Sequence, residues 1–216
     1  MEFKQQRRRD CAFKLLELIV VLAVIVVLAG LILPALALAR YKAKRIQCVN
    51  NLKLVGIGLR VFADDHSNAY PAKLAASLGG AQEFVGPGEV FRHFLTISNT
   101  VTAPKTLICP ADNRRSAKLL SDLKDGNISY FISLDAKIDQ TRILLTGDRN
   151  LILDGTPVNP GLLVLRTNFA VGFSRLLHRG SGNVVLGDGS AWYAPGKSFE
   201  EHLKQEPKET SRVLIP

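Results

Sequence analysis

The chain has 216 residues, of which 47% are hydrophobic and 22% charged, and its formal net charge is +9. This length suits one long helix followed by one globular domain of about 150 to 170 residues. The sequence has no internal repeat or low-complexity segment, which excludes a repeat array. Part of the positive excess, at Arg40, Lys42, Lys44 and Arg45, directly follows an apolar segment. Attraction to anionic lipid head groups explains it better than the alternative, a nucleic-acid-binding role.

The apolar segment runs from Leu15 to Ala39 and is interrupted only by Glu17, Gly30 and Pro34. At about 1.5 Å per residue it is long enough to cross a bilayer as a helix. A carboxylate at the membrane centre costs about 2.5 to 3.5 kcal/mol, so Glu17 requires a partner or an interfacial position. Pro34 removes one backbone donor and predicts a bend or a local break. The segment is longer than a signal-peptide core and lacks a small-x-small cleavage site, so we interpret it as a membrane helix.

Beyond the basic cluster, hydrophobic residues recur at steps of three and four and predict that the helix continues as an amphipathic segment packed on a sheet. These residues are Ile46, Val49, Leu52, Val55, Leu59 and Phe62. Gly56 and Gly58 weaken a helix by about 1 kcal/mol each, so we expect them at points of close packing. The polar residues 64–68 before Pro71 end the helix.

The chain thus divides into a basic leader (1–12), a membrane-embedded helix half (13–39), an amphipathic continuation (40–68) and a globular α+β domain (69–216). Short helices are expected at 72–78, 89–97 and 199–204. Strands of a small antiparallel sheet are expected at 106–108, 129–132, 142–146, 162–166, 183–186 and 190–193. Asp188-Gly189 predicts a tight hairpin turn between the last two strands, and the charged residues from Lys197 onward are expected at the periphery.

The N-terminal pattern is a basic leader, the small residue Ala12, Phe13-x-x-x-Glu17, and an apolar helix that contains Pro34. It resembles the leader of type IV pilins and type II secretion pseudopilins. That family usually has Gly in place of Ala12, and a small hydroxyl residue in place of Lys14. The resemblance implies cleavage between Ala12 and Phe13 and methylation of the new amine. It also implies that Glu17 pairs with the amine of a neighbouring subunit in a filament.

Further motifs along the chain resemble those of a large pseudopilin-like subfamily with a C-terminal domain of the H-x9-DG type. They are Cys48-Val-Asn-Asn-Leu-Lys, Cys109-Pro-Ala-Asp112, Ile128-Ser-Tyr130, and His178 followed after nine residues by Asp188-Gly189. Together they extend the resemblance over nearly the whole chain.

The resemblance implies a non-enzymatic pseudopilin-like subunit of a type II secretion or type IV pilus-type filament. Its implied partners are a prepilin peptidase, other pseudopilin subunits, an inner-membrane assembly platform and an ATPase. Lys and Arg are nearly balanced on the two sides of the apolar segment, so orientation also comes from the resemblance. It implies a single-pass inner-membrane protein with a cytoplasmic N-terminus and a periplasmic domain. The alternative function is a membrane-tethered periplasmic binding module with no filament role.

Two motifs invite a chemical interpretation. His178 and Asp188 suggest acid-base or metal chemistry, but one His and one Asp form an incomplete set. We favour a structural role, in which Asp188 caps local amides beside Gly189 and His178 hydrogen-bonds across the hairpin. Because some major pseudopilins hold calcium in a C-terminal loop, Asp148 and Asp154 are candidate ligands for a structural Ca²⁺, with turn capping as the alternative. No other cofactor is expected.

The sequence has three cysteines, one of them, Cys11, in the leader. Cys48 and Cys109 would face an oxidising periplasm, which permits a disulfide between them without requiring it. No Gly-x-Ser-x-Gly motif of a serine hydrolase occurs. Spacing places neither cysteine against any of the four histidines, which are His66, His93, His178 and His202. We therefore expect no catalytic residue.

Overall fold

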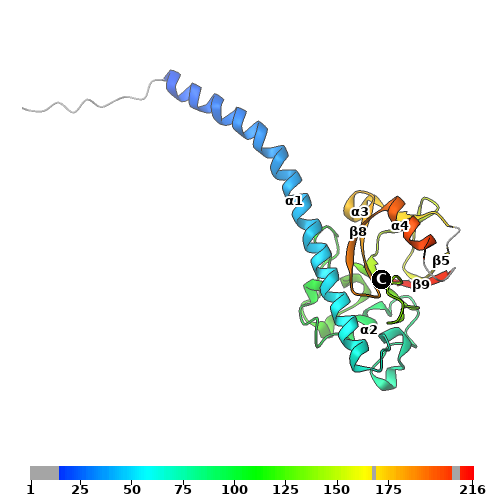
Figure 1. The fold of residues 1–216 in the computed structure, drawn as a ribbon. Coiled ribbons are helices and arrows are strands. Elements are labelled where there is room, and N and C mark those ends of the chain that lie inside the picture. The colour runs from blue at the N-terminus through cyan, green and yellow to red at the C-terminus, as the bar shows by residue number, and fades with distance from the viewer. Residues whose placement is uncertain (1–14, 167–168, 206–209) are drawn as a thin grey trace, which may run out of the picture. The chain divides into compact units, whose positions relative to one another are not determined.

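The computed structural model describes residues 15–166, 169–205 and 210–216, and the chain divides into two compact units, Met1–Lys42 and Ala43–Pro216. Helix α1 (Leu15–Asp65) begins in the first unit and ends in the second (Figure 1). The second unit also contains antiparallel sheets, so the fold is of the α+β class, as predicted. The predicted processing residues Ala12 and Phe13 lie outside the described residues.

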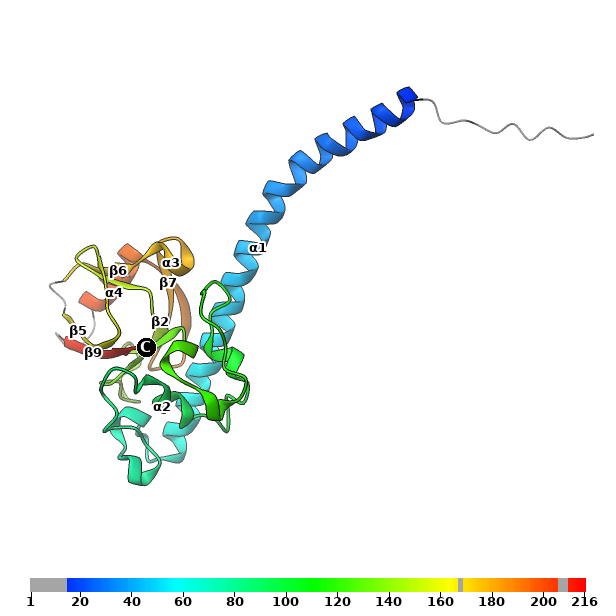
Figure 2. The ribbon, with the colours of Figure 1, turned by 180° about the vertical axis from the view of Figure 1, so that it is seen from behind.

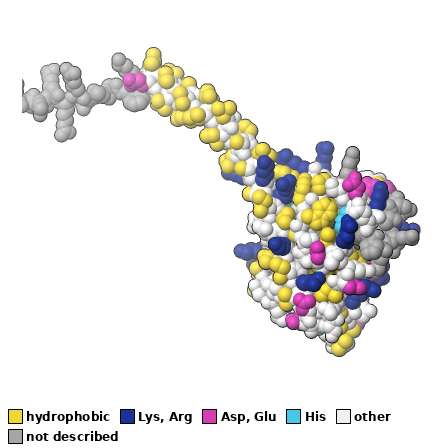
Figure 3. Space-filling view, in the orientation of Figure 1, with side chains coloured by type: hydrophobic (Ala, Val, Ile, Leu, Met, Phe, Trp, Pro, Cys, Tyr) yellow, Lys and Arg dark blue, Asp and Glu magenta, His cyan; other side chains and the backbone are white. Residues whose placement is uncertain are grey.

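The part of α1 that belongs to the first unit exposes its hydrophobic side chains. Leu15 is 74% exposed and Leu31 70%, and hydrophobic side chains cover the visible face of this part of the helix (Figure 3). Within the described residues, α1 is the one helix long and apolar enough to cross a membrane. Glu17 lies in the first turn of α1. The helix continues through Pro34, so the local break that this proline could have caused does not occur.

The remainder of α1 is built into the core of the second unit. Leu52, Val55 and Leu59 are fully buried and Phe62 is buried, which confirms most of the predicted stripe, and Cys48 is fully buried as well. Ile46, in contrast, is 59% exposed. Successive residues of a helix turn by about 100°, which places Ile46 nearly opposite Cys48, so the stripe begins at Cys48.

The two helix glycines are sites of close packing, as expected. A Cβ added to Gly56 would lie 2.7 Å from Val185 Cγ1, and one added to Gly58 would lie 3.1 Å from Val101 Cγ2. The helix therefore approaches its neighbours more closely than a larger residue would allow.

Nine strands form two antiparallel sheets among the described residues. The larger has the order β5-β9-β1-β2-β7-β8 and the smaller the order β4-β3-β6. The strands are β1 (Tyr130–Ser133), β2 (Leu144–Asp148), β3 (Leu151–Leu153), β4 (Thr156–Pro157), β5 (Gly161–Arg166), β6 (Val171–Phe173), β7 (Ser181–Leu186), β8 (Ala191–Pro195) and β9 (Thr210–Ile215).

A hydrophobic core covers each face of the larger sheet. Side chains of a strand alternate between the two faces, so neighbouring residues of one strand can belong to different cores. In β7, Val185 belongs to the core that contains the buried residues of α1, whereas Val184 belongs to a second core with Phe173 and Phe199. Strands β1, β2 and β7 are buried along their whole length. The interior of the domain is therefore divided into two hydrophobic layers by one sheet.

The remaining helices are short. They are α2 (Val90–Leu95), α3 (Arg175–His178), α4 (Gly196–Lys204) and the 3-10 turns η1 (Pro71–Lys73), η2 (Ala76–Leu78), η3 (Pro104–Leu107), η4 (Leu120–Asp122) and η5 (Asp125–Asn127). The predicted helices at 89–97 and 199–204 are confirmed as α2 and α4, while the one at 72–78 is two separate 3-10 turns. The predicted strand 106–108 is wrong. Pro104, whose fixed φ favours the first helical position, starts η3 there instead.

The C-terminal stretch is not peripheral as a whole. Strand β9 lies between β5 and β1, and β5 and β9 run side by side in both ribbon views (Figures 1 and 2). Arg212 of β9 donates to the Asp135 carboxylate through its backbone N, Nε and Nη2 at 2.9, 3.0 and 2.7 Å. This ion pair compensates the charge of Arg212 in the middle of β9, and it explains how a basic segment can form a strand inside the sheet.

Candidate functional site

Four metal-ligating side chains meet in the interior of the second unit. The sulfurs of Cys48 and Cys109, a carboxylate oxygen of Asp148 and a ring nitrogen of His178 all lie within 4.8 Å of one another. The four residues are at most 1% exposed. We refer to these four residues as the buried cluster.

Each member of the buried cluster comes from a different element. Cys48 lies on the face of α1 that packs into the core, and Asp148 is the last residue of β2. Cys109 follows η3 and starts a turn in which its carbonyl accepts the Asp112 N–H at 2.8 Å. His178 ends α3, whose N-terminus is capped by the Ser174 hydroxyl and whose C-cap residue is left-handed. The fold thus brings together residues that are far apart along the chain.

The contacts within the cluster are short. Cys48 Sγ donates to Asp148 Oδ1 at 3.3 Å, and Cys109 Sγ lies 3.2 Å from His178 Nε2. The same His178 nitrogen is 3.4 Å from Asp148 Oδ2. Asp148 Oδ2 also accepts the backbone N–H and the side-chain amide of Asn183, both at 2.8 Å. The carboxylate is therefore held in one orientation by β7.

The environment shifts the pKa of every member. Burial raises the pKa of Asp148 to about 7 and also raises that of Cys48. Hydrogen bonding from Cys48, assisted by His178, lowers the pKa of Cys109 to about 6. Burial alone would lower the pKa of His178, but its contacts with Cys109 and Asp148 raise it. The contact between Cys109 and His178 thus favours the charged form of each side chain.

The motifs singled out in the sequence surround this cluster. Besides Cys48 and Cys109, these motifs contribute Asp112. Its carboxylate accepts hydrogen bonds from Nε and Nη2 of Arg149, each at 2.9 Å, and from the Ser129 hydroxyl at 2.8 Å. Arg149 directly follows Asp148 in the sequence, and the Tyr130 hydroxyl is 3.7 Å from Cys48 Sγ. At least one residue of each motif therefore lies at this location, although Asp188-Gly189 does not, and their spacing alone does not reveal it.

Three kinds of chemistry use such residues: metal binding, nucleophilic catalysis and disulfide formation. A catalytic dyad requires access for a substrate, and the cluster is buried. In a relay, moreover, a histidine contacts the nucleophile and the carboxylate through different ring nitrogens, whereas His178 contacts Cys109 and Asp148 through Nε2. The geometry favours metal binding over catalysis.

The disulfide permitted by the sequence is absent from the structure, in which Cys48 and Cys109 are both free cysteines. Cys48 Sγ donates to Asp148 Oδ1, and Cys109 Sγ contacts His178 Nε2. Spacing in the sequence placed neither cysteine beside a histidine. The structure differs from that expectation, because Cys109 lies beside His178.

The other candidate residues are found elsewhere or in other roles. Asp188 caps the hairpin by accepting the Ser190 N–H at 2.8 Å, as expected, and Gly189 has a φ of +81°. His178 belongs to the buried cluster, where its Nε2 lies 3.2 Å from Cys109 Sγ and 3.4 Å from Asp148 Oδ2. Asp154 lies in a turn and accepts the Ala170 N–H at 3.0 Å, whereas Asp148 is a member of the buried cluster.

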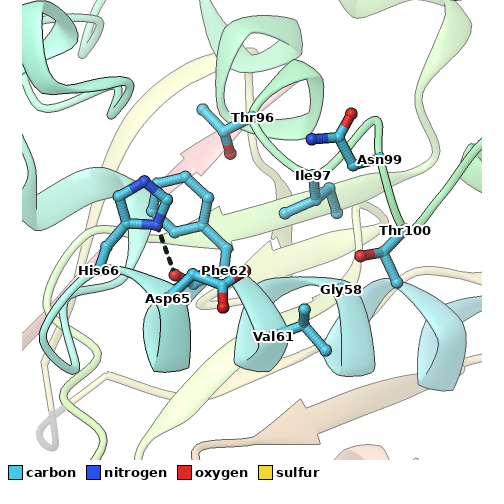
Figure 4. A pocket seen from close by; sticks show the side chains of 9 residues that line it. All are labelled: Gly58, Val61, Phe62, Asp65, His66, Thr96, Ile97, Asn99 and Thr100. Carbon is cyan, nitrogen blue, oxygen red and sulfur yellow. Dashed lines mark hydrogen bonds between the residues drawn. The ribbon is translucent and has the colours of Figure 1, made fainter.

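A small surface pocket offers no comparable chemistry. It has a volume of about 70 Å³ and is lined by the end of α1 and by residues after α2 (Figure 4). Its histidine, His66, is engaged through Nδ1 with the Phe62 carbonyl at 2.7 Å and stacks on the Phe62 ring. These contacts end the helix rather than prepare a site.

Comparisons with protein-family models, curated proteins and solved structures found no match for the chain. The architecture itself, a long apolar N-terminal helix whose later part packs on an antiparallel sheet, resembles that of pilins.

Proposed function

We propose that the chain is a non-enzymatic, pilin-like subunit of a filament of the type II secretion or type IV pilus type, held in the inner membrane until it assembles. The observation that carries the proposal is the division of α1 into two parts. Its first part exposes apolar side chains, and its last turns form part of a domain core. A helix of this kind requires an apolar environment at one end and a folded domain at the other.

Two environments satisfy the exposed part of α1. In the precursor it spans the lipid bilayer, with its N-terminus in the cytoplasm and the domain in the periplasm. In the filament it packs against the same helix of neighbouring subunits. Since both environments have a low dielectric constant, transfer between them sacrifices little of the hydrophobic stabilisation.

Glu17 is the residue that distinguishes this role from simple anchoring. A prepilin peptidase would cut between Ala12 and Phe13, and the new amine would pair with Glu17 of an adjacent subunit. This pair would offset the cost of a carboxylate in an apolar environment. An assembly platform and an ATPase would supply the work of extraction from the membrane.

The proposal is tested by expressing the chain with its peptidase and assembly platform and comparing wild type with Glu17→Leu and Glu17→Gln. We expect both variants to insert into the membrane as wild type does, while the yield of sheared filaments falls at least tenfold. Leu18→Val, a change at the adjacent position, should leave the yield unchanged. Wild-type yield in both Glu17 variants would refute the proposed pairing.

The mature N-terminus supplies a second measurement. Intact mass and N-terminal sequencing should find a chain that begins at methylated Phe13. A chain that still begins at Met1, without filaments, would instead favour a membrane-tethered binding module.

A further inference from the structure

We propose that the buried cluster is a structural zinc site in which Cys48, Cys109, Asp148 and His178 are the four ligands. The inference goes beyond filament assembly, because it concerns only the second unit of the chain. It rests on the donor types, on their separations, on burial and on the residues that hold the donors in place.

The separations suit a tetrahedral zinc ion. Zinc bonds of about 2.0 to 2.3 Å to nitrogen, oxygen and sulfur place neighbouring ligand atoms about 3.3 to 3.8 Å apart. Cys48 Sγ and Asp148 Oδ1 are 3.3 Å apart, and Cys109 Sγ and His178 Nε2 are 3.2 Å apart. Small adjustments of the side chains would admit the ion, since all four ligand atoms already lie within 4.8 Å of each other.

Asp148 has hydrogen-bond partners of the kind that orient the ligands of known metal sites. Asn183 donates twice to Asp148 Oδ2. These bonds orient the carboxylate, and they leave Oδ1, the oxygen beside Cys48, as its ligand atom. Partners that orient a ligand in this way raise metal affinity by about 10- to 100-fold.

The donor set selects among metals. Two thiolates and an imidazole suit zinc, whereas calcium and magnesium require oxygen ligands. The set also provides four protein ligands in a buried space, which leaves no open position for water or substrate. Such closed sites are structural rather than catalytic. A divalent cation would moreover offset the negative charges of thiolates and a carboxylate that water cannot solvate.

The site would fasten α1 to the rest of the domain. Cys48 comes from the helix, while the other ligands come from a loop, from β2 and from α3. The contacts join residues 100 and 69 positions apart in the sequence. A pull on the first part of α1, as extraction from a membrane would exert, would reach the domain through a coordinate bond as well as through hydrophobic packing.

The test uses the full chain, purified in detergent under reducing conditions without added chelator. Inductively coupled plasma mass spectrometry should find about one zinc per chain, and less than one-tenth of that in Cys109→Ser and His178→Gln. His202→Gln, which changes a histidine outside the cluster, should retain the wild-type content. Glu17→Leu should also retain it, so failure of assembly and failure of zinc binding are distinguishable.

Wild-type protein reconstituted with Co²⁺ provides a measurement that does not depend on the folding of a variant. We expect the visible absorption of tetrahedral cobalt together with a thiolate-to-cobalt charge-transfer band in the near ultraviolet. The zinc site would be refuted by wild-type protein that binds neither zinc nor cobalt under reducing conditions. A Cys48–Cys109 disulfide in protein whose thiols are blocked directly in the cell would refute it as well, as would equal zinc in all the variants.

Discussion

The two parts of helix α1 obey the same backbone geometry but derive their stability from different sources. In the first unit, large side chains such as Leu31 and Ile32 are exposed, and in the second, Leu52 and Leu59 are fully buried. Backbone hydrogen bonds alone hold a helix only marginally, so the first part requires an apolar environment, which the proposed function would supply as lipid or as neighbouring subunits. The second part depends on its own sheet. One continuous helix therefore serves as two structural elements.

The largest expected difference between the two parts comes from removing a leucine. Leu52→Ala leaves a cavity in the core and should lower the free energy of unfolding of the domain by about 3 to 4 kcal/mol. Leu31→Ala, on the exposed part, should leave it unchanged. Urea unfolding of the full chain in detergent measures both, with fluorescence of Trp192, the one tryptophan of the sequence, as the probe. Equal losses in the two variants would contradict the comparison.

Glycines on the same helix give the next contrast. A Cβ at Gly56 would lie 2.7 Å from Val185 Cγ1, whereas nothing lies within 4 Å of one at Gly30. We expect Gly56→Leu to cost about 2 to 3 kcal/mol through overpacking. Gly30→Leu should leave the urea midpoint of the domain at its wild-type value. A tolerated Gly56→Leu would show that the helix can move away from β7.

Asp135 tests how charge holds β9 in the sheet. Burial would raise the pKa of Asp135, but Arg212 outweighs burial and holds it well below its usual range. Because the folded pKa lies below the unfolded value of about 3.9, the stabilisation is complete above about pH 5 and is lost as the pH falls. Asp135→Asn should cost about 2 kcal/mol near neutral pH.

The difference between wild type and Asp135→Asn should shrink as the pH approaches about 2. Urea titrations across this pH range check the sign. A difference that stays constant with pH would mean that the carboxylate contributes through packing alone.

The smallest expected effect concerns the hairpin. Asp188→Ala removes the bond to the Ser190 N–H and should cost about 0.5 to 1 kcal/mol. Zinc content should be unchanged, since Asp188 is not in the buried cluster. If zinc were lost with the domain still folded, the four ligands would have to be reassigned.

Local signals allowed much of the fold to be predicted from the sequence. The first part of α1 follows from an apolar run that only Glu17, Gly30 and Pro34 interrupt, its continuation from periodicity, and the β7–β8 hairpin from Asp188-Gly189. The prediction failed where a distant partner decides the outcome. From the sequence alone, residues 210–215 belong to a charged C-terminal stretch that is expected at the periphery. Only the structure shows that Arg212 pairs with Asp135, which lies 77 positions away in the sequence.

The buried cluster was missed for the same reason. Zinc sites are recognised in sequences by paired ligands a few residues apart, and the four proposed ligands of this chain come from four separate segments. The available signal was the occurrence of Cys48, Cys109 and His178 within separate motifs. It identified residues of interest but assigned the histidine to the hairpin, because spacing does not report which segments the sheet brings together.

The place of β9 in the larger sheet bears on when the domain can fold. It is the last strand among the described residues, yet it lies between β5 and β1, so β5 stays separate from the rest of the larger sheet until residues 210–215 join it. Until then β1 and β5 carry unpaired edges that invite aggregation. The larger sheet is therefore complete only when its last strand has joined it.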